Sequence, residues 1–286
     1  WEISWMEKLG ASIGVPYWDA VKLAKIFKKA YGKFITYVVS ATRASGENAT
    51  TVGNSVLNGF VFYLTMFIYS GEDFAILEQN LNHVVAMVMG DDFLAIIDEK
   101  FIDIHRFREI YEDVVKKLGM AITCGFSSES IQVDFLSMIV LPTGKGFRFG
   151  KKPGRNIVKG GVILDNGHNY DENDKAAIIF SNLNSAIPTS SHVPFLREYV
   201  RITMAFIKKN YDVKRVPKNY QKWQRSQWQG DIHEADEITW QAFTSKYGLT
   251  VEDEFNFSRY YSESLKNHGL NCILKHYTVE ALVKYD

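Results

Sequence analysis

Two adjacent carboxylates are the residues best suited to chemistry in this chain. Asp91 and Asp92 follow Gly90, and the tripeptide lies between two short apolar runs, 83–89 and 93–97. Short apolar runs around a tight Gly-Asp turn predict a β-hairpin with both carboxylates at its tip. Charges this close repel one another unless cations neutralise them, and Mg²⁺ prefers a few carboxylates together with phosphate oxygens. The tripeptide is also ordinary turn chemistry, so by itself it is a weak signal.

A second set of polar residues lies upstream of the carboxylates. Ser45 and Gly46 lead into an apolar stretch, 49–69, that we expect to be a mostly buried helix. Thr50 and Asn54 are four residues apart and therefore lie on one face of that helix. A hydroxyl beside a carboxamide suits a ribose, because the 2′-OH both donates and accepts hydrogen bonds. The same residues also fit a helix N-terminus with small polar capping residues.

The two sets resemble motifs of a known family in their order, spacing and expected context. The pattern Ser45-Gly46-x₃-Thr50-x₃-Asn54, followed by Gly90-Asp91-Asp92 in an apolar hairpin, resembles motifs B and C of viral RNA-dependent RNA polymerases. An amphipathic segment at 103–118, with 121–124 after it, looks like motif D. The segment 131–141 looks like the motif E hairpin, so the resemblance covers residues 40–160.

The resemblance implies an α+β fold and a nucleotidyl transfer reaction. Residues 1–142 would form the right-hand polymerase palm, an antiparallel sheet with flanking helices, and residues 143–286 the motif E exit region and a mainly helical thumb. Two Mg²⁺ or Mn²⁺ ions would promote attack of the RNA 3′-hydroxyl on the α-phosphate of a nucleoside triphosphate, and pyrophosphate would leave. Asp91 would be the principal metal ligand, assisted by Asp92. The residues implied to bind the nucleotide and its ribose are Ser45, Gly46, Thr50 and Asn54.

One half of the family's metal site has no counterpart in this sequence. Motif A is an Asp-x₄₋₅-Asp strand that precedes motif B, but Asp19 is the sole aspartate before Ser45. Asp19 lies at the start of a segment, 21–31, that we expect to be helical. We therefore expect an upstream polymerase segment carrying motif A and the fingers as a partner, and we expect the isolated chain to be inactive. The resemblance assigns no motif D general acid.

A basic middle third is the expected contact with RNA. Residues 143–225 hold 16 Lys and Arg against 6 Asp and Glu, whereas the whole chain has a net charge of zero. Such a block is either the footprint of a polyanion or a solvated basic face. We expect template and product RNA to contact the basic residues that follow motif E, namely Lys145, Arg148, Lys151, Lys152 and Arg155.

Composition limits the other classes of protein. Apolar residues make up 46% of the chain and charged residues 23%, as in ordinary globular proteins. No uninterrupted apolar run approaches 18 residues, so we expect no transmembrane segment. The two cysteines, Cys124 and Cys272, lack metal-ligand spacing and fit a reducing compartment. We expect the host cytoplasm, in a viral replication complex, or the interior of a virus particle.

Two alternatives remain open. A reverse transcriptase palm also carries two aspartates in a hairpin, but in the form aromatic-x-Asp-Asp, where this chain has Met89-Gly90-Asp91-Asp92. That class also lacks the Ser-Gly-x₃-Thr-x₃-Asn helix. A half-palm retained for RNA binding without catalysis would explain the lack of motif A.

Overall fold

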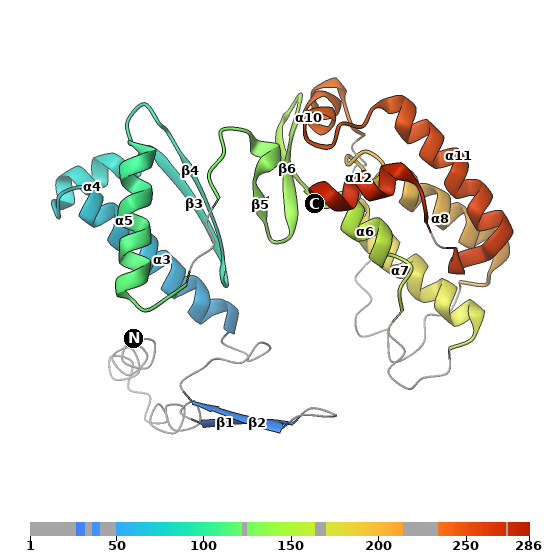
Figure 1. Ribbon diagram of the computed structural model, residues 1–286, viewed down its shortest axis with the longest axis horizontal. Coiled ribbons are helices and arrows are strands. Elements are labelled where there is room, and N and C mark those ends of the chain that lie inside the picture. The colour runs from blue at the N-terminus through green and yellow to red at the C-terminus, as the bar shows by residue number, and fades with distance from the viewer. Residues whose placement is uncertain are drawn as a thin grey trace. The chain divides into compact units, whose positions relative to one another are not determined.

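A computed structural model of the chain describes residues 27–31, 36–40, 50–121, 125–163, 170–213, 234–272 and 274–286 (Figure 1). Helices and small antiparallel sheets give the mixed α+β composition that the sequence predicts. The chain divides into two compact units, Trp1–Cys124 and Gly125–Asp286. The expected boundary after residue 142 lies inside the second unit, because β6 (Met138–Thr143) pairs over its whole length with β7 (Gly146–Lys151).

The first described elements of unit 1 are two antiparallel strands. β1 (Phe27–Tyr31) pairs with β2 (Thr36–Ser40), in a register that runs from Phe27↔Ser40 to Tyr31↔Thr36. The helix expected over 21–31 is therefore wrong for its last five residues. Local apolar spacing favoured a helix there, but the β-branched and aromatic residues of β2 favour strand pairing. Pairing with a partner strand therefore decides the structure of these residues, and the weak helical spacing of their apolar side chains does not.

The elements that carry the carboxylates follow in unit 1. They are α3 (Thr50–Tyr69), α4 (Phe74–Leu81), β3 (Val84–Met89), β4 (Asp92–Ile97) and α5 (Ile104–Lys117). They confirm the predicted order of helix, hairpin and helix. The start of α5 is fixed by Asp103, whose side chain accepts hydrogen bonds from the backbone N–H groups of His105 and Arg106. Gly119, with φ of 72°, follows its end.

The apolar faces of these helices and one face of the hairpin share a core. Phe62 of α3 lies 5.2 Å from Phe93 of β4 and 6.1 Å from Phe107 of α5, measured between ring centroids. Apolar residues of α5 recur every three or four positions and therefore lie on one side of the helix. The buried members of this core are Val61, Phe62, Met66, Leu77, Ile102, Phe107, Tyr111, Val114 and Val115.

The other face of the hairpin is open. Val85 and Ile96 are cross-strand neighbours, and each is 60% exposed. Among the residues that the structure describes, this sheet has two strands, so the outer edges of β3 and β4 have no strand partner. A two-stranded hairpin alone is marginally stable in water. The packing of its inner face against α3 and α5 is therefore what holds it in place.

The length and composition of α3 also pass the minimum test for a membrane span. Over Thr51–Tyr69 its mean hydropathy is 1.3, and no other helix in the described ranges meets the same criteria. Only 22% of this window is buried, so the expectation of a mostly buried helix is wrong, although α3 contributes Val61, Phe62 and Met66 to the core. One helix that passes this test is weak evidence for a membrane span. The structure thus contains no clear transmembrane segment within its described residues.

Unit 2 opens with a small sheet. A short helix, η1 (Ser130–Gln132), leads into β5 (Asp134–Phe135), and the sheet has the order β5-β6-β7 with antiparallel pairing throughout. Leu136 and Ser137 connect β5 to β6 with φ of 55° and 57°, the pattern of a type I′ turn. Strand structure was predicted over 131–141, and it is confirmed for β5 and β6 but not for 131–132, which belong to η1. β7 and α6 (Pro153–Lys159) lie in a glycine-rich basic stretch whose apolar residues show neither strand nor helix spacing.

The other elements that the structure describes in unit 2 are helices (Figure 1). They are α7 (Glu172–Ser190), α8 (Leu196–Asn210), α10 (Glu237–Tyr247), α11 (Val251–His268), the short η2 (Gly269–Asn271) and α12 (Tyr277–Tyr285). The predicted helical character of this region is confirmed. Its core is aromatic: Phe195 lies 5.8 Å from both Phe243 and Phe257, and Tyr199 lies 5.1 Å from Tyr261, between ring centroids.

A buried carboxylate joins α8 to α11. Glu254 is 4% exposed, and its two oxygens accept hydrogen bonds from the backbone N–H of Phe195 at 2.7 Å and from the Arg197 guanidinium at 2.9 Å. Phe195 has φ of 62° and ψ of −44°, and the Leu196 N–H donates to the Pro194 carbonyl oxygen at 2.7 Å. This is a γ-turn with positive φ, a strained conformation that costs about 1–3 kcal/mol. The Glu254 carboxylate therefore helps to hold the strained residue from which α8 begins.

We expect Glu254→Ala to lower the free energy of unfolding by about 2–4 kcal/mol, because it leaves a buried N–H and a largely buried guanidinium without their acceptor. Glu254→Gln should cost less, since the amide oxygen still accepts one bond. Glu252→Ala, an exposed neighbour on the same helix turn, is the control. Urea unfolding measures all three. Equal values for Glu254→Ala and Glu252→Ala would contradict this role.

Candidate functional site

The predicted hairpin is present, and its tip carries the two aspartates. The register of β3 and β4 ends with Met89 opposite Asp92, so Gly90 and Asp91 are the two central residues of the turn. Gly90 has φ of 66° and Asp91 does not have positive φ, which is the pattern of a type II′ turn. A Cβ at Gly90 would meet no atom within 4 Å. Glycine is therefore needed here for its backbone conformation and not for space.

The residues of the turn differ in their exposure to solvent. Gly90 is buried, whereas Asp91 and Asp92 are both exposed. The strand that follows is anchored by Phe93, whose ring lies 5.2 Å from Phe62 and 6.1 Å from Tyr111. The turn thus presents two acidic side chains outward from an anchored backbone, as a metal-binding turn requires.

Helix α3 holds this turn through two side chains. Ser55 Oγ accepts a hydrogen bond from the backbone N–H of Gly90 at 2.8 Å, and Asn58 Nδ2 donates to the Gly90 carbonyl oxygen at 2.8 Å. Ser55 Oγ also donates to the Thr51 carbonyl oxygen at 2.7 Å. Both backbone polar groups of Gly90 are therefore bound by residues three positions apart on one helix.

The structure describes two of the four residues that are expected to bind the ribose. Thr50 begins α3 and Asn54 lies one turn further on, half-buried. Because Asn54 is four residues before Asn58, both lie on one side of α3, the side that holds the Gly90 turn. Ser45 and Gly46 lie outside the described residues. The structure thus brings the Thr50–Asn54 helix and the Asp91–Asp92 turn into contact, although they are far apart in sequence.

Sequence reasoning missed Ser55 and Asn58 as site residues. The available signal was a polar stripe, Thr51-Ser55-Asn58, at helical spacing on a helix whose later turns are mostly apolar. Polar residues on the buried side of a helix need partners. The pattern therefore indicated a polar contact on this face, without indicating its partner.

The two carboxylates at the turn are of a chemical type that could share a Mg²⁺ ion with other ligands. Among the described residues, no group of three or more His, Cys, Asp or Glu side chains gathers in a way that would enclose a metal ion. Two adjacent, exposed carboxylates match the open arrangement of Mg²⁺ sites, where one or two carboxylates share the ion with waters and substrate phosphates. Asp91 and Asp92 would hold such an ion, which would supply charge neutralisation for phosphoryl chemistry.

The five basic residues expected at RNA do not form one surface. Lys145 lies in the β6–β7 turn, Arg148 and Lys151 are on β7, and Arg155 is on α6. Side chains alternate along a strand, so Arg148 and Lys151 project from opposite faces of β7. The Lys152 side chain is 12% exposed, and its ammonium bonds to the Asp134 carboxylate and the Asp286 carbonyl oxygen. That ammonium ties β5 to the end of α12.

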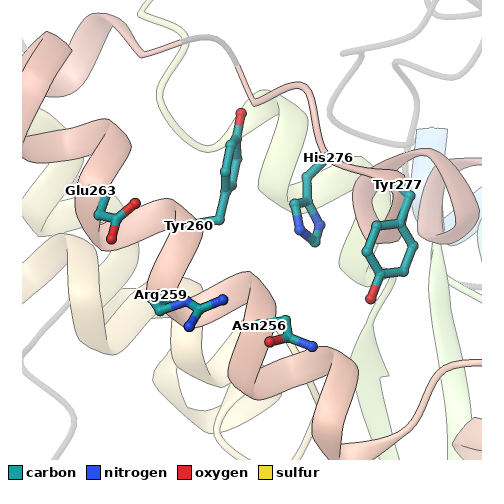
Figure 2. Close-up of a pocket in the computed structure, with 6 residues that line it drawn as sticks. All are labelled: Asn256, Arg259, Tyr260, Glu263, His276 and Tyr277. Atoms are coloured by element: carbon teal, nitrogen blue, oxygen red, sulfur yellow. The ribbon is translucent and has the colours of Figure 1, made fainter.

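Unit 2 also has a shallow surface pocket of about 430 Å³ between α11 and the start of α12 (Figure 2). Its lining residues are Asn256, Arg259, Tyr260, Glu263, His276 and Tyr277. The His276 ring lies 4.8 Å from the Tyr260 ring and 4.6 Å from the Tyr277 ring, between centroids. The Tyr277 hydroxyl donates to Asp253. These contacts join two helices, and the pocket contains none of the predicted site residues.

His276 has a structural role at this pocket because it is the N-cap of α12. Its Nδ1 accepts a hydrogen bond from the Thr278 backbone N–H. Burial lowers the pKa of His276 from its ordinary value of 6.5, and the Asp253 carboxylate opposes this in part. A protonated imidazole has no acceptor and cannot cap a helix. The folded chain therefore favours neutral His276.

Comparison with known proteins gives no relative: no protein-family model matches the chain, and no curated protein matches it.

We expect acid to destabilise α12 through His276. A group whose folded pKa is lowered contributes stability at neutral pH that is lost as pH falls below its unfolded value, here 6.5. Between pH 7.5 and 5.5, the melting temperature should fall less in His276→Asn than in the wild type, because asparagine still caps the helix but does not titrate. An identical fall in His276→Asn and the wild type would refute the assignment.

Proposed function

We propose that this chain is the palm and thumb segment of a viral RNA-dependent RNA polymerase, acting in template-directed nucleotidyl transfer. The observation that carries the proposal is the contact between two motifs that were identified separately in the sequence. The turn with Asp91 and Asp92 is hydrogen-bonded to α3, the helix that carries Thr50 and Asn54. A polymerase needs its metal-binding carboxylates and its ribose-binding groups at one site, because both act on the same incoming nucleotide.

The open sheet supports the need for an upstream partner segment. The hairpin has free outer edges among the described residues, and an apolar face with Val85 and Ile96 exposed. An added strand would satisfy the edge hydrogen-bonding groups. In the proposed enzyme that strand is motif A, which would bring the missing aspartate of the metal site. Within that complete site, Asp91 and Asp92 bind the ions, and Asn54 and Ser45 bind the ribose.

The proposed thumb is the part of unit 2 from residue 143 onward, and its partner is the template–product RNA. Lys145 and Arg155 are exposed, and Arg148 and Lys151 are half-buried. Arginine and lysine side chains of this kind bind phosphate backbones without reading sequence. The proposed setting is a replication complex in the host cytoplasm or a virus particle, with nucleoside triphosphates and Mg²⁺ or Mn²⁺ as the small ligands.

One observation favours a second candidate, a half-palm that binds RNA without catalysis. The described residues place two carboxylates at the turn and bring no third acidic group to them. A catalytic segment and a binding module differ in their dependence on Asp91. RNA affinity comes from the basic residues in both, whereas only catalysis needs the metal ligand.

We expect Asp91→Asn, in the enzyme completed by its upstream segment, to lower nucleotide incorporation by about 10³-fold or more, since the lost carboxylate stabilises transition-state charge through the metal. RNA affinity should stay within about twofold, because phosphate contacts by other residues supply it. Asp98→Asn is the matched control, as it removes an exposed aspartate just beyond the other end of the hairpin. Primer extension and RNA binding are measured on all three proteins. Incorporation by Asp91→Asn within tenfold of wild type would remove Asp91 from the site.

We expect Asn54→Ala to narrow the preference for ribonucleotides over deoxyribonucleotides about tenfold, since one lost hydrogen bond is worth about 1–3 kcal/mol. The measurement is kcat/KM for each nucleotide in the completed enzyme. Asn82→Ala, an exposed asparagine just after α4, should leave the ratio unchanged. A ratio that also stays unchanged in Asn54→Ala would take Asn54 out of ribose recognition, even if both rates fell.

A further inference from the structure

We infer that Ser55 and Asn58 are positioning residues that set the Asp91 and Asp92 carboxylates by holding the Gly90 peptide groups. The inference rests on the proposed function, because it takes the turn as a metal-binding turn. It adds a dependence that the motifs do not contain: the affinity of the turn for a divalent cation is controlled by two neutral side chains of α3.

The first step concerns the polar groups of Gly90. In a two-residue hairpin turn, the N–H and C=O of the first central residue lie outside the strand ladder, and solvent normally binds them. Here Gly90 is buried, and Ser55 and Asn58 bind these groups at 2.8 Å each. A buried peptide with both groups bound by one helix has little freedom to shift or tilt.

The second step concerns the orientation of the two side chains. The Ser55 hydroxyl proton is directed to the Thr51 carbonyl oxygen at 2.7 Å, so its lone pairs remain for the Gly90 N–H. A carbonyl oxygen can only accept, so the Asn58 group that faces the Gly90 oxygen must be its NH₂. Chemistry therefore allows one hydrogen-bond arrangement, and neither side chain can be reversed.

The third step links the two hydrogen bonds that Ser55 and Asn58 make to Gly90, here called the clamp, to the carboxylates. Asp91 and Asp92 lie between the clamped residue Gly90 and the anchored residue Phe93. Metal-binding groups must be held within about 0.5 Å of their working geometry. With both flanks fixed, the backbone that carries the carboxylates is held to a narrow range. Loss of the clamp frees one flank, which spreads the carboxylates over more positions and weakens binding of the ion.

The fourth step links the clamp to nucleotide recognition. Asn54 precedes Ser55 directly and lies one turn before Asn58, so the three residues occupy adjacent turns of one helix. If this part of α3 is displaced, the Gly90 peptide groups and the Asn54 carboxamide move together. We therefore expect α3 to make the ribose-binding side and the metal-binding side of the site move as one.

The experiment uses the 286-residue chain, with Mn²⁺ as the probe. Amide signals of Gly90, Asp91 and Asp92 are followed by NMR for Mn²⁺ broadening and for hydrogen exchange. Ser55→Ala and Asn58→Ala should each raise the half-saturating Mn²⁺ concentration at least fivefold, and Ser55→Ala should speed exchange at the Gly90 amide at least tenfold. Ser55→Thr keeps the hydroxyl and should restore both values.

Matched controls remove similar side-chain bonds elsewhere. Ser262 Oγ donates to the Ser258 carbonyl oxygen, and Asn210 Nδ2 donates to the Phe206 carbonyl oxygen, each within its own helix. Ser262→Ala and Asn210→Ala should leave Mn²⁺ binding and Gly90 exchange unchanged. A general loss of stability would appear in the melting temperature, and Ser55→Thr provides the comparison if an alanine variant does not fold.

The outcomes separate the inference from the proposed function. If wild type shows no Mn²⁺ broadening at the turn, or if Asp91→Asn leaves it intact, the metal-binding role itself fails. If broadening is present and lost in Asp91→Asn, yet Ser55→Ala and Asn58→Ala bind Mn²⁺ as wild type does, the positioning role alone is overturned.

Discussion

A buried peptide group must find hydrogen-bond partners, and this requirement at Gly90 sets the arrangement of unit 1. An unsatisfied buried donor or acceptor costs about 1–3 kcal/mol, a large fraction of the stability of a small domain. Helix α3 supplies both partners and also one wall of the core. The residues involved follow one another at helical spacing along a single stripe of the helix, which is polar at its first turns and apolar beyond: Thr51, Ser55, Asn58, Phe62, Met66 and Tyr69. A rotation of α3 by one residue would lose the clamp and the core contact together. The hydrogen bonds to the hairpin turn and the packing of the core therefore both require the same rotation of α3 about its axis.

The features that were predictable from the sequence are those with local causes. The hairpin was predictable from a glycine, which tolerates the positive φ of the turn, between two short runs of apolar residues with high strand propensity. Helix α5 was predictable from its regular apolar spacing, and Asp103 caps its start. The clamp has no local cause, since Ser55 and Asn58 meet Gly90 across 35 and 32 residues of sequence. The strand at 27–31 was missed for a different reason: its pairing with the next strand, β2, decides its structure, and the spacing of apolar residues did not reveal that pairing. Local patterns identify elements, and contacts between distant segments decide which polar residue serves which purpose.

Net charge is a poor guide to which side chains face a ligand in unit 2. The basic middle third contains Lys152, which holds Asp134 and the Asp286 carbonyl, and Arg197, which holds buried Glu254. Arg201 pairs with Glu198 on α8. These cations contribute to the charge of the segment while bonding within the fold. Any RNA surface must be built from the remaining cations, and on β7 these project from both faces of the strand.

The open hairpin has a consequence for how this protein behaves in a cell or an expression host. β3 reads Val-Val-Ala-Met-Val-Met, a six-residue segment with high strand propensity and neither charge nor proline. Such segments are templates for intermolecular β-pairing and amyloid-type stacking when their edges are accessible. Natural edge strands are usually protected by lysine, proline or a bulge, and β3 has no lysine or proline. A strand paired with the open edge would thus prevent intermolecular pairing of β3. Its absence would show first as aggregation during synthesis, before any defect in chemistry is measured.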